Sequence, residues 1–205
     1  MQIEVLKSKQ KEIFPALNQF KEFYLVGGTA LALQMGHRIS VDFDLFTKKK
    51  LPSGLFEKAK RIFLGFKVST SLKLPNQLAI KVNDVKIDFV HDEFGLLLKP
   101  IEFKKLKIAQ IPEIAAMKAY ALNFRGSTKD YFDLYSILKE KRASLQEIEN
   151  IARRKYKNEF NFRLFLEQLL YLEGLRNDEV EFLKPEPSKE QMKKFFEQEI
   201  SKIKL

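Results

Sequence analysis

The residues best suited to chemistry are two aspartates and two glycines in the first quarter of the chain. Asp42 and Asp44 alternate with apolar residues, and the two-residue period of a strand puts both carboxylates on one face. Side by side they repel each other unless they are solvated or hold a divalent cation between them. Gly27 and Gly28 let the backbone turn sharply and approach a ligand closely. The short helix expected at 30–35 offers its first backbone N–H groups to an anion such as phosphate.

Together these features predict a phosphate cradle followed, one short helix later, by a metal-binding Asp-x-Asp strand. Thirteen residues separate Gly28 from Asp42. A third carboxylate, Asp88, lies on the polar face of a predicted strand at 85–90, and we interpret it as the third acid of the metal site. The alternatives are a structural glycine turn, a solvated strand face and an ordinary solvent-facing Asp88. The combination is the arrangement of a nucleotidyltransferase.

The elements that must position these groups change in kind along the chain. Alternating apolar runs predict strands at 23–26, 41–46, 78–82 and 85–90. Helical patterns dominate from about residue 105 onward. This order predicts an α+β fold, in which a mixed β-sheet of about four to six strands, with flanking helices, precedes a C-terminal helical half. The glycine turn and the acids make the expected sheet nucleotidyltransferase-like. The expected domains are 1–104, which is catalytic, and 105–205, which is helical.

Local signals also predict details of these elements. Asn83-Asp84, between two alternating runs, is typical of a two-residue hairpin turn. The helix expected at 112–124 buries an apolar stripe that runs as far as Phe124 and carries Lys118 at the border of that stripe. Ser144 and Ser188 each begin a capping-box pattern, so two further helices are expected to start there.

Composition narrows the class of protein. The chain carries a net charge of +10 and has a pI near 9.5, which favours a polyanionic partner such as nucleic acid; the alternative is a Lys/Glu-rich surface that serves solubility. Cysteine is absent, which excludes disulfides and thiolate metal sites, and two histidines argue against a His-rich zinc site. No apolar run reaches the ~18 residues of a membrane span. We expect a cytoplasmic protein without a membrane partner.

Several ordered motifs share their sequence and spacing with one known family. They are Gly27-Gly28-Thr29, Gly36-His37-Arg38, Asp42-Phe43-Asp44, Lys86-Ile87-Asp88, Met117-Lys118, Arg125-Gly126 and Lys129-Asp130 with Asp133. Between Phe23 and Leu138 the chain closely resembles the AbiEii/AbiGii toxin family, nucleotidyltransferases of the DNA polymerase β-like superfamily. The resemblance implies Mg²⁺-dependent transfer of a nucleotide from an NTP to an acceptor. It also implies that the protein is the toxin of a toxin–antitoxin pair. Some members of the family modify tRNA 3′ ends.

For the strand-rich half, the resemblance and the residues together predict a metal and phosphate site. Asp42 and Asp44 are expected to hold two Mg²⁺ ions. Asp88 is expected to complete the metal site and to favour deprotonation of the acceptor hydroxyl. The triphosphate is expected to lie on Gly27, Gly28 and the hydroxyl of Thr29, although many superfamily members have Gly-Ser at this turn. Arg38 is a candidate phosphate ligand; the alternative is a cation that suits the C-terminus of the preceding helix.

For the helical half, the resemblance identifies Lys118 with the family's helical-domain lysine and Asp130 with its last-motif aspartate. Lys118 is expected to neutralise phosphate charge, the alternative being a lysine that snorkels at a helix border. Asp130 is expected to contact the nucleotide or to orient Lys118, the alternative being a carboxylate favoured at a helix N-terminus.

Three functions are compatible with these residues. The first is a toxin-like enzyme that nucleotidylates RNA or protein, with an NTP, an RNA acceptor and a cognate antitoxin as partners. The second is a small-molecule nucleotidyltransferase of the antibiotic-modifying kind, which would need an acidic pocket for a cationic acceptor. The third is a non-catalytic nucleotide-binding module, against which the intact acids Asp42, Asp44 and Asp88 argue.

Overall fold

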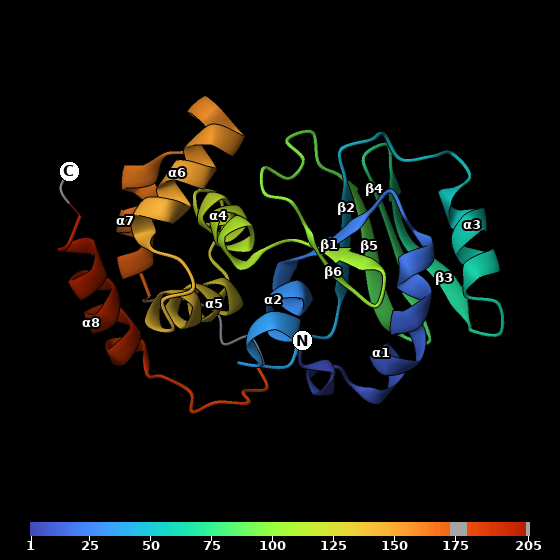
Figure 1. The fold of residues 1–205 in the computed structure, drawn as a ribbon, viewed down its shortest axis with the longest axis horizontal. Helices are drawn as coiled ribbons and strands as arrows, with labels where there is room; N and C mark the ends of the chain where they lie inside the picture. The colour runs from blue at the N-terminus through green and yellow to red at the C-terminus, as the bar shows by residue number, and fades with distance from the viewer. Residues whose placement is uncertain (173–179, 204–205) are drawn as a thin grey trace. The chain divides into compact units, whose positions relative to one another are not determined.

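The computed structural model describes residues 1–172 and 180–203. The chain forms two compact units, Met1–Gln110 and Ile111–Leu205 (Figure 1). The first unit contains a mixed sheet and the second is helical, so the predicted α+β class is confirmed. In the described residues no helix is long and apolar enough to cross a lipid bilayer.

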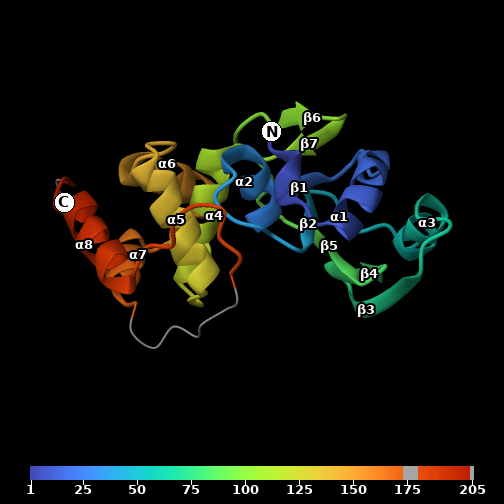
Figure 2. The ribbon, with the colours of Figure 1, turned by 90° about the horizontal axis from the view of Figure 1, so that it is seen from below.

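The first unit is organised around a seven-stranded sheet with the order β3-β4-β5-β2-β1-β7-β6. The strands are β1 Tyr24–Val26, β2 Phe43–Thr47, β3 Val68–Leu74, β4 Gln77–Val82, β5 Val85–His91, β6 Ile101–Phe103 and β7 Leu106–Ile108. The β2–β5 and β1–β7 pairs are parallel, and the other pairs are antiparallel. The β3–β4 and β6–β7 hairpins lie at opposite edges of the sheet (Figure 2).

The helices of the first unit are short. They are η1 Ile3–Val5, α1 Ser8–Ile13, η2 Phe14–Gln19, α2 Gly27–Met35 and α3 Leu55–Ile62. The N-terminal helical segment is divided into α1 and the 3₁₀ helix η2 because Pro15 has no N–H to donate and disfavours a continuous α-helix. Phe20, Phe23, Phe63 and Phe89 form an aromatic cluster on one face of β5, with ring centroids of Phe20 and Phe89 4.8 Å apart. This cluster ties the N-terminal segment and α3 to the sheet.

Two hairpins show where local patterns succeed and fail. Asn83 and Asp84 have φ angles of +47° and +71° and join β4 to β5, so the predicted two-residue turn is confirmed. The β6–β7 hairpin was not predicted, because its strands have three residues each. Since Ile108 of β7 pairs with Leu25 of β1, the sheet continues past residue 104, and the compact units divide at residue 110 instead.

The helical unit contains five α-helices in the described residues. They are α4 Ile111–Leu122, α5 Thr128–Lys139, α6 Leu145–Tyr156, α7 Phe162–Leu170 and α8 Lys189–Ile200, with a 3₁₀ turn η3 at Lys157–Glu159. Helix α4 packs against α5, α6 and α7, and α8 packs against α5 and α7. The predicted N-caps are confirmed, since Ser144 and Ser188 each accept a hydrogen bond from the backbone N–H three residues later.

The prediction that Phe124 faces the core is wrong. Helix α4 ends at Leu122, so the helical period does not extend to Phe124, which is 69% exposed. Ile114, at the start of the predicted stripe, is buried as expected, Leu122 is buried as well, and Lys118, one turn from each of them, is buried with them. The lysine expected at the border of the apolar stripe therefore lies inside the helical unit.

Candidate active site

The first turn of α2 lies directly against β2. Val26, the last residue of β1, pairs with Asp44 of β2, and the chain then turns at Gly27 with φ of +69°. A Cβ atom at Gly27 would collide with the carboxylate of Asp44. Only glycine satisfies both requirements, the left-handed backbone and the close approach. The structure thus brings the glycine turn and the Asp-x-Asp strand into contact.

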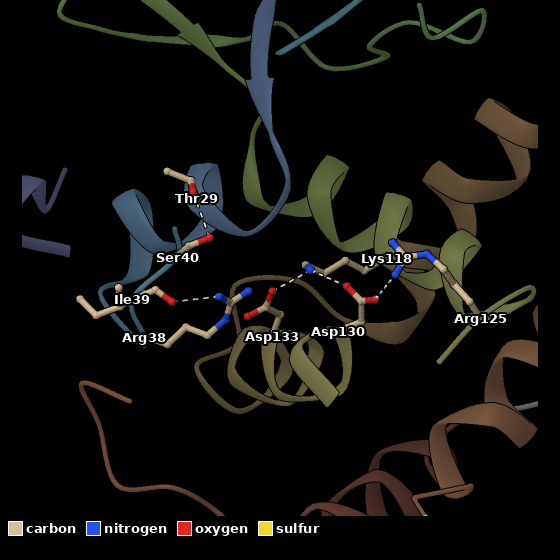
Figure 3. A network of polar contacts seen from close by, with 8 residues as sticks. All are labelled: Thr29, Arg38, Ile39, Ser40, Lys118, Arg125, Asp130 and Asp133. Carbon is tan, nitrogen blue, oxygen red and sulfur yellow. Dashed lines mark hydrogen bonds and ion pairs between the residues drawn. The ribbon is translucent and has the colours of Figure 1, made fainter. Parts of the chain in front are cut away.

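The next glycine lies against a cation. A Cβ atom at Gly28 would lie 2.6 Å from Nη2 of Arg38 and 2.9 Å from Oγ of Ser40. The guanidinium of Arg38 is almost completely buried, and its Nη1 donates to the backbone carbonyl of Ile39 at 3.0 Å (Figure 3). A fixed positive charge therefore stands beside the turn where the sequence predicts phosphate.

Thr29 has a structural task in this arrangement. Its side chain is fully buried, and its hydroxyl donates to the backbone carbonyl of Asp42 and is hydrogen-bonded to the hydroxyl of Ser40 at 2.9 Å (Figure 3). These bonds join α2 to the segment that leads into β2. The geometry supports Thr29 as a residue that positions Asp42 and gives no support to the expected contact between its hydroxyl and phosphate.

The parallel pairing of β2 with β5 places the third acid. Asp44 and Asp88 are direct neighbours in this register, so their side chains leave the same face of the sheet. Asp88 is 5% exposed and accepts a hydrogen bond from Nε2 of Gln77 at 3.2 Å. Asp42, which directly precedes β2, and Asp44 are half-buried. The acids expected to form one site therefore come from two adjacent strands, β2 and β5, and from the residue just before β2.

An ammonium group accompanies these acids. Nζ of Lys86 lies 2.5 Å from Oδ2 of Asp88. The hydrogen bond to Asp88 raises the pKa of Lys86, partial burial opposes the shift, and the charges of Asp88, Asp42 and Asp44 raise it further. Lys86 was not among the predicted site residues. The signal was present, because Lys86 and Asp88 are two residues apart on one strand and share a face.

The carboxylates of Asp42, Asp44 and Asp88 are chemically suited to bind a hard cation such as Mg²⁺. Mg²⁺ prefers oxygen ligands such as carboxylates. One of these carboxylates, that of Asp88, already binds a cation, the ammonium of Lys86. In the described residues, however, no three His, Cys, Asp or Glu side chains are already gathered around one metal position. Asp88 faces Lys86 and Gln77, so a metal ion requires its carboxylate to change partners.

A second charged network lies in the helical unit. Nζ of Lys118 is 2.7 Å from Oδ1 of Asp130 and 2.6 Å from Oδ2 of Asp133, while Nη1 of the exposed Arg125 is 3.7 Å from Oδ2 of Asp130 (Figure 3). The side chain of Lys118 is 9% exposed and that of Asp133 is fully buried. The interpretation of Lys118 as a snorkelling surface lysine is therefore wrong, and Asp130 orients it, as one of our predictions states. Asp133, which follows Asp130 by one helical turn, is a partner that we did not predict.

The chain matches one protein family over most of its length. The family described as "Nucleotidyl transferase AbiEii toxin, Type IV TA system" matches residues 11–203. The uncharacterized protein aq_aa25 of Aquifex aeolicus (strain VF5) is 32% identical over 200 residues, which cover 95% of this chain and 96% of that protein.

Solved structures show the same fold. A putative nucleotidyltransferase from H. pylori superposes with a TM-score of 0.55 at 15% identity and covers 96% of each chain. JHP933 from Helicobacter pylori superposes with a TM-score of 0.53 at 16% identity, over 95% of this chain and 94% of the other.

Proposed function

Since the chain belongs to the AbiEii toxin family of nucleotidyltransferases, we propose that it transfers a nucleotide from an NTP to an RNA acceptor in a Mg²⁺-dependent reaction, as the toxin of a toxin–antitoxin pair. The observation that carries the proposal is the contact of Gly27 with Asp44, together with the register that pairs Asp44 with Asp88. A phosphate on the glycine turn then lies next to the acids that would hold its metal ions.

The proposed reaction forms one phosphorus–oxygen bond and breaks another. The acceptor hydroxyl attacks the α-phosphorus of the NTP, its proton passes to a carboxylate, for which Asp88 is the candidate, and pyrophosphate leaves. Asp42, Asp44 and Asp88 would hold Mg²⁺, which when bound neutralises charge on the attacking and leaving oxygens. The turn at Gly27 and Gly28 would position the triphosphate by its backbone N–H groups.

Two neighbouring residues support this arrangement. Arg38 would add positive charge beside the turn, since its Nη2 lies against Gly28. Thr29 would keep Asp42 in place by its hydrogen bond to the Asp42 carbonyl. For Lys118 and Asp130, contact with the nucleotide stays a prediction.

The distribution of charge favours a nucleic-acid acceptor. Residues 1–110 carry 19 Lys and Arg against 11 Asp and Glu, a net charge of +8, whereas residues 111–205 carry 18 against 16. The excess positive charge is therefore concentrated in the unit that holds the glycine turn and the acids. Such an excess attracts a polyanion through counterion release.

A small, cationic acceptor of the antibiotic kind is less well supported. One cavity of about 410 Å³ in the first unit is lined by apolar residues with Ser53 and Lys73, and one of about 520 Å³ in the helical unit has Lys139 and Lys194 against the single acid Glu186. Neither cavity has the acidic lining that would bind a polycation.

The test is incubation of the purified protein with each labelled NTP, Mg²⁺ and total cellular RNA. We expect label in RNA with one or more NTPs and the loss of labelling with EDTA. Asp44→Asn removes a charge at nearly constant shape and is expected to reduce labelling ~100-fold or more, because the metal site loses a ligand. Asp84→Asn, at an exposed hairpin turn, is the matched control and should label like the wild type.

The outcomes separate the alternatives. Label in an added aminoglycoside with none in RNA would favour the small-molecule enzyme, and label in protein would replace the RNA acceptor by a protein. Full activity of Asp44→Asn would refute the assigned site. Growth arrest on expression of the wild type, relieved by a neighbouring gene and absent with Asp44→Asn, would support the toxin role.

A further inference from the structure

The ammonium of Lys86 lies beside Asp88, but the proposed reaction gives it no role. Its Nζ lies 2.5 Å from Oδ2 of Asp88, and the side chain of Asp88 is only 8% exposed. A charged group so deeply buried is stable only with a counter-charge or hydrogen bonds. The amide of Gln77 supplies one hydrogen bond to the other oxygen, at 3.2 Å, and Lys86 supplies the charge.

The position of Lys86 relates it to all three acids. It precedes Asp88 by two residues on β5, and the parallel partner of Asp88 on β2 is Asp44. Its ammonium also interacts with the charges of Asp42 and Asp44. A metal ion at Asp88 would need the carboxylate that now pairs with Lys86, and its positive charge would repel the ammonium. Lys86 and a divalent cation therefore compete for Asp88.

We propose that Lys86 is a built-in counter-ion of Asp88, beside Asp44 on the neighbouring strand, and that it holds the carboxylate of Asp88 in the metal-free enzyme and must leave when a divalent cation binds there. The inference rests on the proposed function, because it assigns the metal to these acids. It has two consequences: Lys86 weakens metal binding in the absence of nucleotide, and it stabilises the metal-free fold.

The exchange is feasible because Lys86 is only partly buried. Its side chain is 43% exposed, so four methylene groups can swing the ammonium into solvent without disturbing the packing of β5. An ion pair with one exposed partner contributes only a modest free energy to stability, so breaking it costs little. The arriving cation has twice the charge of the ammonium, so it can displace Lys86 while the ammonium still reduces the apparent affinity.

The experiment measures the binding of Mn²⁺ to the protein in titrations without nucleotide. Unbound Mn²⁺ is quantified by its electron paramagnetic resonance signal. We expect Lys86→Gln to bind Mn²⁺ ~3- to 5-fold more tightly than the wild type, the range that corresponds to losing a half-exposed ion pair. Lys81→Gln is the matched control, since Lys81 is exposed and pairs directly with Lys86 across β4 and β5. It removes the same formal charge and is expected to leave the Kd unchanged.

Thermal unfolding gives a second readout that does not depend on turnover. In EDTA, Lys86→Gln is expected to melt a few degrees below both the wild type and Lys81→Gln, because the three acids lose a nearby cation. Saturating Mn²⁺ should remove the difference. A general effect of surface charge would shift both lysine variants equally and would refute the assignment to Lys86.

The inference and the proposed function fail in different ways. If the wild type binds no Mn²⁺, or if Asp44→Asn binds it equally well, the metal site and the inference both fall. If the wild type binds Mn²⁺ through Asp44 and Lys86→Gln has the same or a weaker affinity, only the inference is refuted. Weaker binding of NTP by Lys86→Gln together with unchanged Mn²⁺ affinity would make Lys86 a phosphate ligand instead.

Discussion

Replacing Lys118 by alanine tests what holds the helical unit together. The ammonium lies 2.7 Å from Oδ1 of Asp130 and 2.6 Å from Oδ2 of Asp133, so those two oxygens are at most about 5.3 Å apart. With an effective dielectric constant of ~20, two unit charges at ~5 Å repel by about 3 kcal/mol. Breaking a buried ion pair by removing one partner typically costs ~3–5 kcal/mol. We expect Lys118→Ala to lower the free energy of unfolding by about 3–5 kcal/mol.

Equilibrium unfolding in urea, followed by tyrosine fluorescence, measures this change. The chain has no tryptophan, and five of its six tyrosines lie in residues 111–205, so the signal reports mainly on the helical unit. The triple variant Lys118→Met, Asp130→Asn, Asp133→Asn removes all three charges and is expected to recover most of the lost stability, since no acids remain to repel each other. Lys129→Ala, on the same helix as both acids, is the control.

A change below ~0.5 kcal/mol in Lys118→Ala would refute this reasoning and restore the interpretation of Lys118 as a surface lysine. If Lys118→Ala loses much stability and the triple variant is equally unstable, the packing of the lysine stem is responsible, and not its charge. Because the triple variant is expected to fold, its transfer activity then tests whether Lys118 and Asp130 contribute to the reaction beyond stabilising the helical unit.

Three further predictions concern single positions. Gly27→Ala forces a side chain into a left-handed backbone against Asp44 and should lower the free energy of unfolding by ~1–3 kcal/mol, measured by thermal denaturation; unchanged stability would contradict the contact. Burial and the charge of Asp130 raise the pKa of Tyr131 to about 12, so its contribution to stability is complete below pH ~10 and lost between pH ~10 and 12; urea unfolding of Tyr131→Phe should lack this alkaline loss. Asp84→Gly should stabilise the hairpin by ~0.5–1 kcal/mol because φ at this position is +71°, and a decrease in melting temperature would refute this.

Local chemistry was enough to predict several elements. The turn at Asn83-Asp84 depends on two residues that tolerate positive φ, and the helix starts at Ser144 and Ser188 depend on a side chain and a backbone N–H three positions apart. The spacing of the glycine turn and Asp44 likewise predicts a phosphate and metal site from residue types alone. Each of these signals operates within a short segment, which is why the sequence by itself reveals it.

The tertiary structure decided which segments meet. The sequence predicted strands around Asp44 and Asp88, but only the strand order makes β2 and β5 parallel neighbours and puts these acids side by side. The same holds for β7, whose three residues are a strand because β1 offers them an edge. Strand order depends on which apolar faces bury each other across distant parts of the chain, and no local pattern encodes it.

The packing of the helices determined which charged residues form ion pairs. By its period, Lys118 belonged to the edge of an apolar stripe, yet the end of α4 at Leu122 and the packing of α5 enclose it with Asp130 and Asp133. An ammonium inside a protein is stable only where carboxylates converge on it, and that convergence needs two packed helices. The sequence therefore determined which groups are able to act, and the packing of distant elements determined which of them act together.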